Sequence, residues 1–241
     1  VNHIVTASAG NHAQGVAYSA RKLKIKATIF MPRTTPSIKI EEVKKMKSEV
    51  VLVGDNFDES LDSALKFCKK YKLPFIHPFD DPEVISGQGT IGKEIIEDFQ
   101  EKIDVIFVAV GGGGLISGLG AYIKSFYPKI KIVAVEAEDA AGLYKSLEIG
   151  KRIKLDKVGL FADGAAAKQI GLNNYQLIKE WLDDSITVST DEICAAVKDT
   201  FAETRTVPEP TGALALAGLK KYITKRKIKN KNLIDTYLSL I

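Results

Sequence analysis

The sequence predicts an α/β protein built on parallel sheets and divided into two lobes. Short apolar segments rich in valine and isoleucine alternate with longer segments whose apolar residues recur at helical spacing. Several short segments are apolar at every position, which is typical of strands covered on both faces. Alternation of such strands with helices favours parallel strands joined by right-handed crossovers. A chain of 241 residues, 45% of them hydrophobic, can bury a core of ordinary size.

Strands are expected where valine and isoleucine gather in runs too short for a helix. The runs are Ile4–Ala7, Ala27–Met31, Val50–Val53, Val105–Val110, Ile132–Val135 and Ile186–Val188, with a last one at Tyr237–Ile241.

Helices are expected between these strands, where one apolar stripe repeats at helical spacing. A helix that starts at His12 carries its stripe on Ala13, Val16, Ala17, Ala20 and Leu23. Another starts near Asp191, whose side chain suits the N-cap position. Two more are expected over Leu115–Phe126 and Leu214–Tyr222.

The boundary between the lobes is expected in the proline-rich stretch from Pro74 to Pro82. We place a small lobe at residues 1–78 and a large lobe at residues 79–241. The chain enters a strand directly after Val1, without a methionine, and stops inside the apolar segment that ends at Ile241. We therefore expect a fragment, with the large lobe incomplete.

Composition and charge exclude several classes of partner. The net charge is +4, and the lysines between Lys220 and Lys231 have no interleaved aromatic residues, so an exposed helix face explains them better than nucleic-acid binding. No apolar run approaches the ~20 residues of a membrane span. Two cysteines are too few for a disulfide framework, which indicates a reducing, cytoplasmic location.

The strongest chemical motif is the glycine run Gly111, Gly112, Gly113 and Gly114, between the strand at Val105–Val110 and the helix that starts at Leu115. Backbone N–H groups of such a loop, together with the helix dipole, favour a bound phosphate. Consecutive glycines cost unfolded-state entropy, so a turn without a ligand would rarely keep them.

The glycine run alone does not identify the phosphate compound. A nucleotide-binding P-loop requires a lysine and a hydroxyl residue after its last glycine, and Gly118 is followed by Leu119. A dinucleotide fingerprint fits better, although Ser117 stands in place of its third glycine. Glu136 follows about 20 residues later, where an acid that binds ribose would lie. A nicotinamide-dependent oxidoreductase therefore remains an alternative.

A second polar loop, Ser8 to His12, also joins a strand to a helix. Its residues suit helix capping and ligand binding equally well. Since it is the second strand-end loop rich in hydrogen-bonding groups, we expect a site at the carboxyl ends of the strands.

Two further motifs are weaker alone. Pro210 suits the first turn of a helix. Glu209, just before it, could stabilise the helix dipole or act as a site carboxylate. The small residues from Phe161 to Ala165 would let the backbone approach a flat ring.

Taken in order, these motifs resemble the fold-type II pyridoxal 5′-phosphate (PLP) enzymes, and among them the threonine dehydratases (threonine ammonia-lyases). The resemblance covers nearly the whole chain, from Thr6 to about Asn232. It is carried by TASAGNHAQGVA from Thr6, DNFDES from Asp55, GQGT from Gly87, VGGGGLISG from Val110, VAVEAEDAA from Val133, VGLFADG from Val158 and EPTGALALAGLKKY from Glu209.

The resemblance implies a PLP-dependent conversion of L-threonine to 2-oxobutanoate, or of L-serine to pyruvate, with release of ammonia, in isoleucine biosynthesis. It implies that Asn11 contacts the cofactor's ring hydroxyl oxygen, and that Gly111 to Gly114 and Leu115 cradle its phosphate. Backbone N–H groups around Ser8, Gly10 and His12 would hold the substrate carboxylate. Glu209 would face the substrate, and Gly164 would pass near the ring. The parent enzyme would be a cytoplasmic homo-oligomer, a dimer or a tetramer.

The sequence departs from the family pattern at both ends. The lysine that binds the cofactor covalently lies, in the family, upstream of the loop at Ser8, and the family's serine turn that meets the pyridine nitrogen lies beyond Ile241. We therefore expect no catalytic lysine in this chain and no turnover by it alone.

The related serine racemases are an alternative. Their divalent-metal site would fall on Glu136, Ala140 and Gly142. Because Gly142 offers no side-chain oxygen, we expect no metal site, and dehydration is favoured over racemisation.

Overall fold

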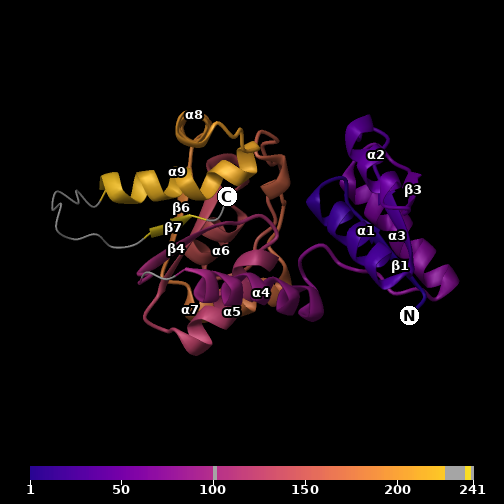
Figure 1. Ribbon diagram of the computed structural model, residues 1–241, viewed down its shortest axis with the longest axis horizontal. Helices are drawn as coiled ribbons and strands as arrows, with labels where there is room; N and C mark the ends of the chain where they lie inside the picture. The colour runs from indigo at the N-terminus through magenta and orange to yellow at the C-terminus, as the bar shows by residue number, and fades with distance from the viewer. Residues whose placement is uncertain (100–101, 226–236, 240–241) are drawn as a thin grey trace. The chain divides into compact units, whose positions relative to one another are not determined.

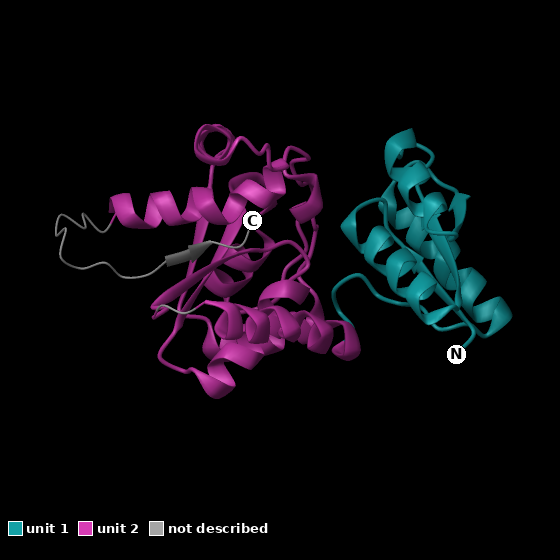
Figure 2. Ribbon diagram, in the orientation of Figure 1, with its two compact units in different colours: residues 1–81 teal, residues 82–241 magenta. Residues whose placement is uncertain are grey.

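The computed structural model describes residues 1–99, 102–225 and 237–239, and it divides into two compact units (Figure 2). Unit 1 comprises Val1–Asp81 and unit 2 comprises Pro82–Ile241. The boundary expected from the prolines, after residue 78, lies three residues before this division. In each unit the strands are parallel, as the alternation of strands and helices predicts.

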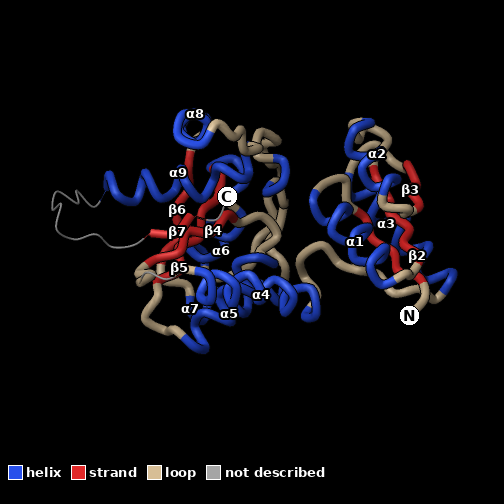
Figure 3. The backbone as a smooth tube through the Cα atoms, viewed as in Figure 1, coloured by secondary structure: helices blue, strands red, loops and turns tan. Residues whose placement is uncertain are grey.

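Unit 1 is a small parallel sheet with helices on both faces (Figure 3). Its strands lie in the order β1-β2-β3, and Val5 pairs with Thr28 and Ile29 with Val50. The next segment, residues 74–76, runs beside β1, where the Val5 N–H donates to the Pro74 carbonyl. The elements are β1 (His3–Ala7), α1 (Asn11–Leu23), β2 (Lys26–Met31), α2 (Ser37–Lys45), β3 (Glu49–Leu52) and α3 (Phe57–Tyr71).

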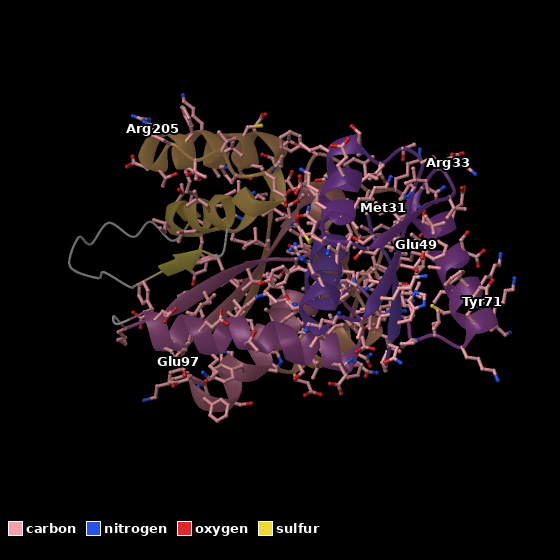
Figure 4. The ribbon with its side chains drawn as sticks, turned by 45° about the vertical axis from the view of Figure 1, so that its right-hand side comes forward. Met31, Arg33, Glu49, Tyr71, Glu97 and Arg205 are labelled. Atoms are coloured by element: carbon pink, nitrogen blue, oxygen red, sulfur yellow. The ribbon has the colours of Figure 1, made fainter. Side chains whose placement is uncertain are left out.

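The core of unit 1 follows from strands that are apolar at successive positions. Along β2, Phe30 points to α3 and packs with Ala64 and Cys68, while the neighbouring Met31 points the other way and packs with Ala17 of α1 and Val43 of α2. Figure 4 labels Met31 within the unit, and Glu49 at the start of β3. Both faces of the sheet are thereby buried.

Unit 2 contains a larger parallel sheet with strand order β6-β5-β4-β7 (Figure 1). The central strand β4 pairs with β5 and with β7, with Val105 opposite Lys131 and Tyr237. The elements are α4 (Pro82–Asp98), β4 (Val105–Ala109), α5 (Gly114–Phe126), β5 (Lys131–Ala137), η1 (Glu138–Ala140), α6 (Gly142–Ile149), η2 (Asp163–Ala165), α7 (Leu172–Trp181), β6 (Asp184–Val188), α8 (Thr190–Thr204), α9 (Pro210–Lys225) and β7 (Tyr237–Ser239).

Successive residues of β4 pack into separate hydrophobic cores on the two faces of this sheet. Phe107 contributes to the core under α8 and α9, where its ring lies 5.1 Å from that of Tyr222. Ile106 contributes to the opposite core, with Leu119 of α5 and Ile178 of α7. The sheet therefore lies between two helical layers.

Helix α4 crosses α5 at glycines, with almost no space between the two backbones. A Cβ on Gly118 would lie 2.1 Å from the Ile85 carbonyl oxygen, and one on Gly89 would lie 3.2 Å from the Gly118 carbonyl oxygen. The GQGT motif is thus part of a helix-packing contact. Toward its other end α4 carries the exposed pair Lys93 and Glu97, the latter labelled in Figure 4.

The predicted strands are all present, with ends that shift by one or two residues. The last of them, Tyr237–Ile241, is β7 over Tyr237–Ser239, and its remaining two residues lie outside the described part. The predicted N-cap Asp191 is wrong. Ser189 is the N-cap of α8, because its hydroxyl accepts from the Glu192 N–H while the Glu192 carboxylate accepts from the Ser189 N–H, a reciprocal capping box.

Within the described residues, no helix has both the length and the apolar character needed to cross a bilayer. Both cysteines are free thiols, with Cys68 buried in unit 1 and Cys194 exposed on α8.

Candidate functional site

The glycine run of unit 2 lies at the carboxyl end of β4, as the sequence predicts, and leads directly into α5. Gly113 is the N-cap of α5 and has a left-handed backbone (φ 94°), and no side chain caps the helix. The first N–H groups of α5 therefore have no side-chain acceptor from this cap. Such a helix start is an anion site, since its N–H groups and its dipole both favour negative charge.

Two of the glycines are required by close contacts. A Cβ on Gly111 would lie 2.8 Å from the Ala165 Cα atom, which is backbone and cannot swing aside. A Cβ on Gly113 would lie 2.6 Å from the Ile170 side chain and 3.0 Å from the Asn174 Cβ atom. The loop is therefore held between the 162–165 segment and the start of α7, and any side chain there would displace it.

The carbonyl of Gly112 is tied to the start of α7 by two hydrogen bonds. The Gly171 N–H donates to this oxygen at 3.0 Å, and the side-chain amide of Asn174 donates to it at 2.9 Å. Asn174 is fully buried. Its amide therefore fixes the orientation of one peptide in the glycine loop.

The other two motifs of unit 2 meet next to this loop. A Cβ on Gly164 would lie 3.0 Å from the Thr211 hydroxyl oxygen, so the 162–165 segment packs on the first turn of α9. The Thr211 hydroxyl is buried and has no hydrogen-bond partner among the described residues. Glu209 is exposed immediately before Pro210, the first residue of α9. The expected position of Pro210 in the first turn is confirmed.

Within unit 2, the structure thus brings together the glycine run, Gly164 and the start of α9. The residues fit a phosphate group followed by a flat ring. The donors are N–H groups at the start of α5, a Cβ on Gly111 would displace the neighbouring backbone, and the buried Thr211 hydroxyl can still form a hydrogen bond.

In unit 1, the polar loop Ser8 to His12 leads from β1 into α1 without capping it. Gly10 is the N-cap and supplies no side chain, and the Ser8 hydroxyl accepts from the Gly10 N–H at 3.2 Å instead of from the helix. Asn11 is exposed in the first turn. The loop therefore does not cap α1 with a side chain, which was one of its two interpretations. The N–H groups at the start of the helix still favour a bound anion, which was the other.

The ring of His12 contacts β1 and the segment at residues 74–76. Its Nε2 atom lies 3.0 Å from the Thr6 hydroxyl and 3.2 Å from the Ile76 carbonyl oxygen. Burial lowers the pKa of His12 below its usual value, against the opposing effect of the Ile76 carbonyl. His12 can therefore contribute only its backbone N–H to an anion, while its side chain anchors the loop to β1.

Glu136 does not serve either of the alternative roles that its position suggested. Its carboxylate is buried at the end of β5 and accepts from the N–H groups of Leu143 (2.9 Å) and Tyr144 (2.7 Å). It thus caps α6, and burial raises its pKa to about 7. A carboxylate enclosed in this way is not available to a ribose hydroxyl, and it does not face outward as a metal ligand would.

Sequence reasoning missed the residues that hold the glycine loop in place. Ala165 ends the small-residue segment that begins at Phe161, but Ile170 and Asn174, which also touch the loop, stand in no motif that the sequence indicated. A signal for Asn174 was present. It lies four residues before Ile178 on the buried face of α7, where an apolar residue would be expected, and a buried amide there requires a specific partner.

Comparison with known proteins agrees with this geometry. The sequence pattern of the family described as "Pyridoxal-phosphate dependent enzyme" matches residues 1–240. The mitochondrial threonine dehydratase of Schizosaccharomyces pombe is 52% identical over 232 residues, which are 96% of this chain and 39% of that protein. The chain therefore spans about two fifths of the length of this relative.

Solved structures give the same result. The processed form of threonine deaminase isoform 2 from Solanum lycopersicum superposes with a TM-score of 0.92 at 45% identity, covering 96% of this chain and 63% of that one. A serine racemase from Dictyostelium discoideum superposes with a TM-score of 0.86 at 31% identity, covering 99% of this chain and 75% of that one. The fold-type II architecture expected from the motifs is thereby confirmed.

Proposed function

Since the chain belongs to the family of pyridoxal-phosphate-dependent enzymes, we propose that it forms the cofactor- and substrate-binding part of a threonine dehydratase. The reaction converts L-threonine to 2-oxobutanoate and ammonia, and L-serine to pyruvate and ammonia, as a step of isoleucine biosynthesis. The observation that carries the proposal is the glycine run at the start of α5, clamped by Ala165 and Asn174, in a chain 52% identical to a threonine dehydratase.

In this proposal the phosphate of PLP binds to the loop of Gly111 to Gly114 and to Leu115. The support is electrostatic, because an anion at this helix start gains hydrogen bonds from backbone N–H groups and a favourable dipole. Gly164 passes beside the ring, and the nearby Thr211 hydroxyl offers a further hydrogen bond. When bound, PLP supplies an electron sink for bond changes at the substrate's Cα atom.

The polar loop of unit 1 has a separate part in the proposal. Asn11, exposed in the first turn of α1, binds the ring hydroxyl oxygen. The substrate carboxylate is held by Ser8 and by the backbone N–H groups of Gly10 and His12. Anchoring of the His12 ring to Thr6 and Ile76 supports this role, since it fixes the backbone donors in advance. Glu209 faces the substrate.

The residues at the position where serine racemases would bind a divalent cation favour dehydration over racemisation. Glu136 is occupied by the N–H groups of α6, and Gly142 has no side-chain oxygen. We further propose that the intact protein is a cytoplasmic homo-oligomer, for which the free thiols of Cys68 and Cys194 are in keeping with a reducing compartment.

The test separates binding from turnover. Pyridoxine 5′-phosphate, which has no aldehyde and so needs no lysine, is titrated calorimetrically into the purified chain. Saturable binding is expected, and Gly113→Ala should abolish it, because its Cβ would displace Ile170 and Asn174. Gly87→Ala, where a Cβ meets nothing within 4 Å, is the matched control.

Turnover is then measured in the intact natural protein as 2-oxobutanoate formed from L-threonine. Absence of both binding and turnover, or binding of a nicotinamide dinucleotide in place of the pyridoxine compound, would overturn the proposal.

A further inference from the structure

We propose that Asn174 is a positioning residue for the phosphate-binding loop, acting by locking the peptide between Gly112 and Gly113 in the orientation that presents its N–H to the phosphate. This inference rests on the proposed function, because it assigns the loop to a phosphate. It extends that proposal to a residue of α7 that touches neither the cofactor nor the substrate.

The lock consists of the bonds to the Gly112 carbonyl oxygen. This oxygen accepts from the Gly171 N–H and from the Asn174 side-chain amide, at 3.0 and 2.9 Å, so both bonds have ordinary lengths. The Gly171 donor is backbone and remains in any variant. The Asn174 donor is the part of the lock that a single substitution can remove.

The orientation of the carbonyl determines that of the neighbouring N–H. The peptide between Gly112 and Gly113 is trans, so its C=O and N–H bonds point in opposite directions. With the carbonyl turned toward α7, the Gly113 N–H must point away from α7. A flipped peptide would present a carbonyl oxygen in place of this donor, and its negative partial charge would repel a phosphate.

A lock is needed because glycine makes the flip inexpensive. Both residues of this peptide lack a Cβ, and Gly113 already occupies the left-handed region at φ 94°. Without side chains, sterics alone do not select one orientation. A buried amide that gains its hydrogen bond only in one of them supplies the selection.

Asn174 is itself held firmly enough to act in this way. It is fully buried in the first turn of α7, and its Cβ atom lies 3.0 Å from the position that a Cβ on Gly113 would take. The same helix packs on α5 further along, where the Trp181 ring fills the space beside Gly120. The amide is therefore fixed by packing before any ligand binds.

The test uses Asn174→Asp, which keeps the shape of the side chain and replaces the donor by an acceptor. At pH 8 we expect its affinity for pyridoxine 5′-phosphate to fall about tenfold, which corresponds to about 1.4 kcal/mol. Its affinity for pyridoxine, which has no phosphate, should stay within twofold of the original. At pH 5 the introduced carboxyl can be protonated and donate again, so the difference from the original protein at the same pH should narrow.

A second variant and a control complete the design. Asn174→Leu removes the donor without introducing a charge, and it should show the same phosphate-selective loss with no recovery at pH 5. This variant also supplies the comparison if Asn174→Asp folds only at pH 5. Gln176→Glu makes the same chemical change at an exposed position of α7 and should bind both compounds normally.

The outcomes distinguish this inference from the proposed function. If the original protein does not bind pyridoxine 5′-phosphate, the proposed function fails. If the original protein binds it and both Asn174 variants bind it equally well, the lock is refuted while the proposed function stands. Equal losses for the phosphorylated and unphosphorylated compounds would show a merely structural role and would also refute the lock.

Discussion

The buried carboxylate of Glu136 makes the stability of unit 2 depend on pH in an unusual direction. Its pKa is raised from 4.5 to about 7, because burial outweighs the N–H groups of Leu143 and Tyr144 that favour the charged form. The folded protein therefore binds this proton more tightly than the unfolded chain. The contribution of Glu136 to stability is fully present below pH 4.5 and is lost as the pH rises from there to about 7.

The size of the effect follows from the same two pKa values. A difference of one unit between the pKa of a group in the folded and in the unfolded state corresponds to a free energy of about 1.4 kcal/mol. Between pH 5 and pH 8, Glu136 should lower the free energy of unfolding by about 2.5 kcal/mol. Because other groups also titrate, the informative quantity is the difference between the protein and its Glu136→Gln variant, whose side chain is neutral throughout.

Urea unfolding followed by tryptophan fluorescence measures this difference. The protein has a single tryptophan, Trp181, and it lies in unit 2 with Glu136. The stability of the original protein relative to Glu136→Gln should decline by about 2.5 kcal/mol from pH 5 to pH 8. Glu148→Gln, at an exposed position of α6, is the matched control and should show no such decline. A constant difference would show that the N–H groups balance burial, and a difference that grows with pH would show that they outweigh it. Either result would refute the reasoning.

Further substitutions test the packing that supports the site. Gly118→Ala on α5 places a Cβ 2.1 Å from the Ile85 carbonyl oxygen of α4, so we expect the free energy of unfolding in urea to fall by about 1–3 kcal/mol. Gly87→Ala on α4 places a Cβ that meets nothing within 4 Å and should be neutral or slightly stabilising. Phe107→Ala empties a fully buried site beside Tyr222 and should cost about 3–5 kcal/mol in the same measurement, and a loss below 1 kcal/mol would contradict the assigned core.

The strands and the glycine run could be predicted from the sequence because their signals are local. A buried parallel strand such as Val105–Ala109 is apolar at every position, and the glycines that follow have few uses other than close approach of a ligand or backbone. The prediction of Asp191 as the N-cap of α8 was wrong because Asp191 and Ser189 both suit that position. Only the reciprocal pairing of Ser189 with Glu192 decides between them.

The role of Glu136 and the clamps on the glycine loop could not be predicted, because they depend on contacts between distant segments. Asn174 lies 62 residues beyond Gly112 in the chain, and nothing in either local sequence specifies that the amide reaches that carbonyl. Glu136 at a strand end suits a ribose, a metal or a helix start equally well. The role of Glu136 depends on where α6 begins, which is at Gly142.

The glycine contact between α4 and α5 has a mechanical consequence. Helix α4 is the first element after the division between the units, and its backbone touches that of α5 at Gly89 and Gly118 with no side chain between them. Such a contact resists sliding, because any shift in register would drive a side chain into a carbonyl. We therefore expect α4 and α5 to move as one body, so that a displacement of α4 also moves the start of α5, where the glycine loop ends.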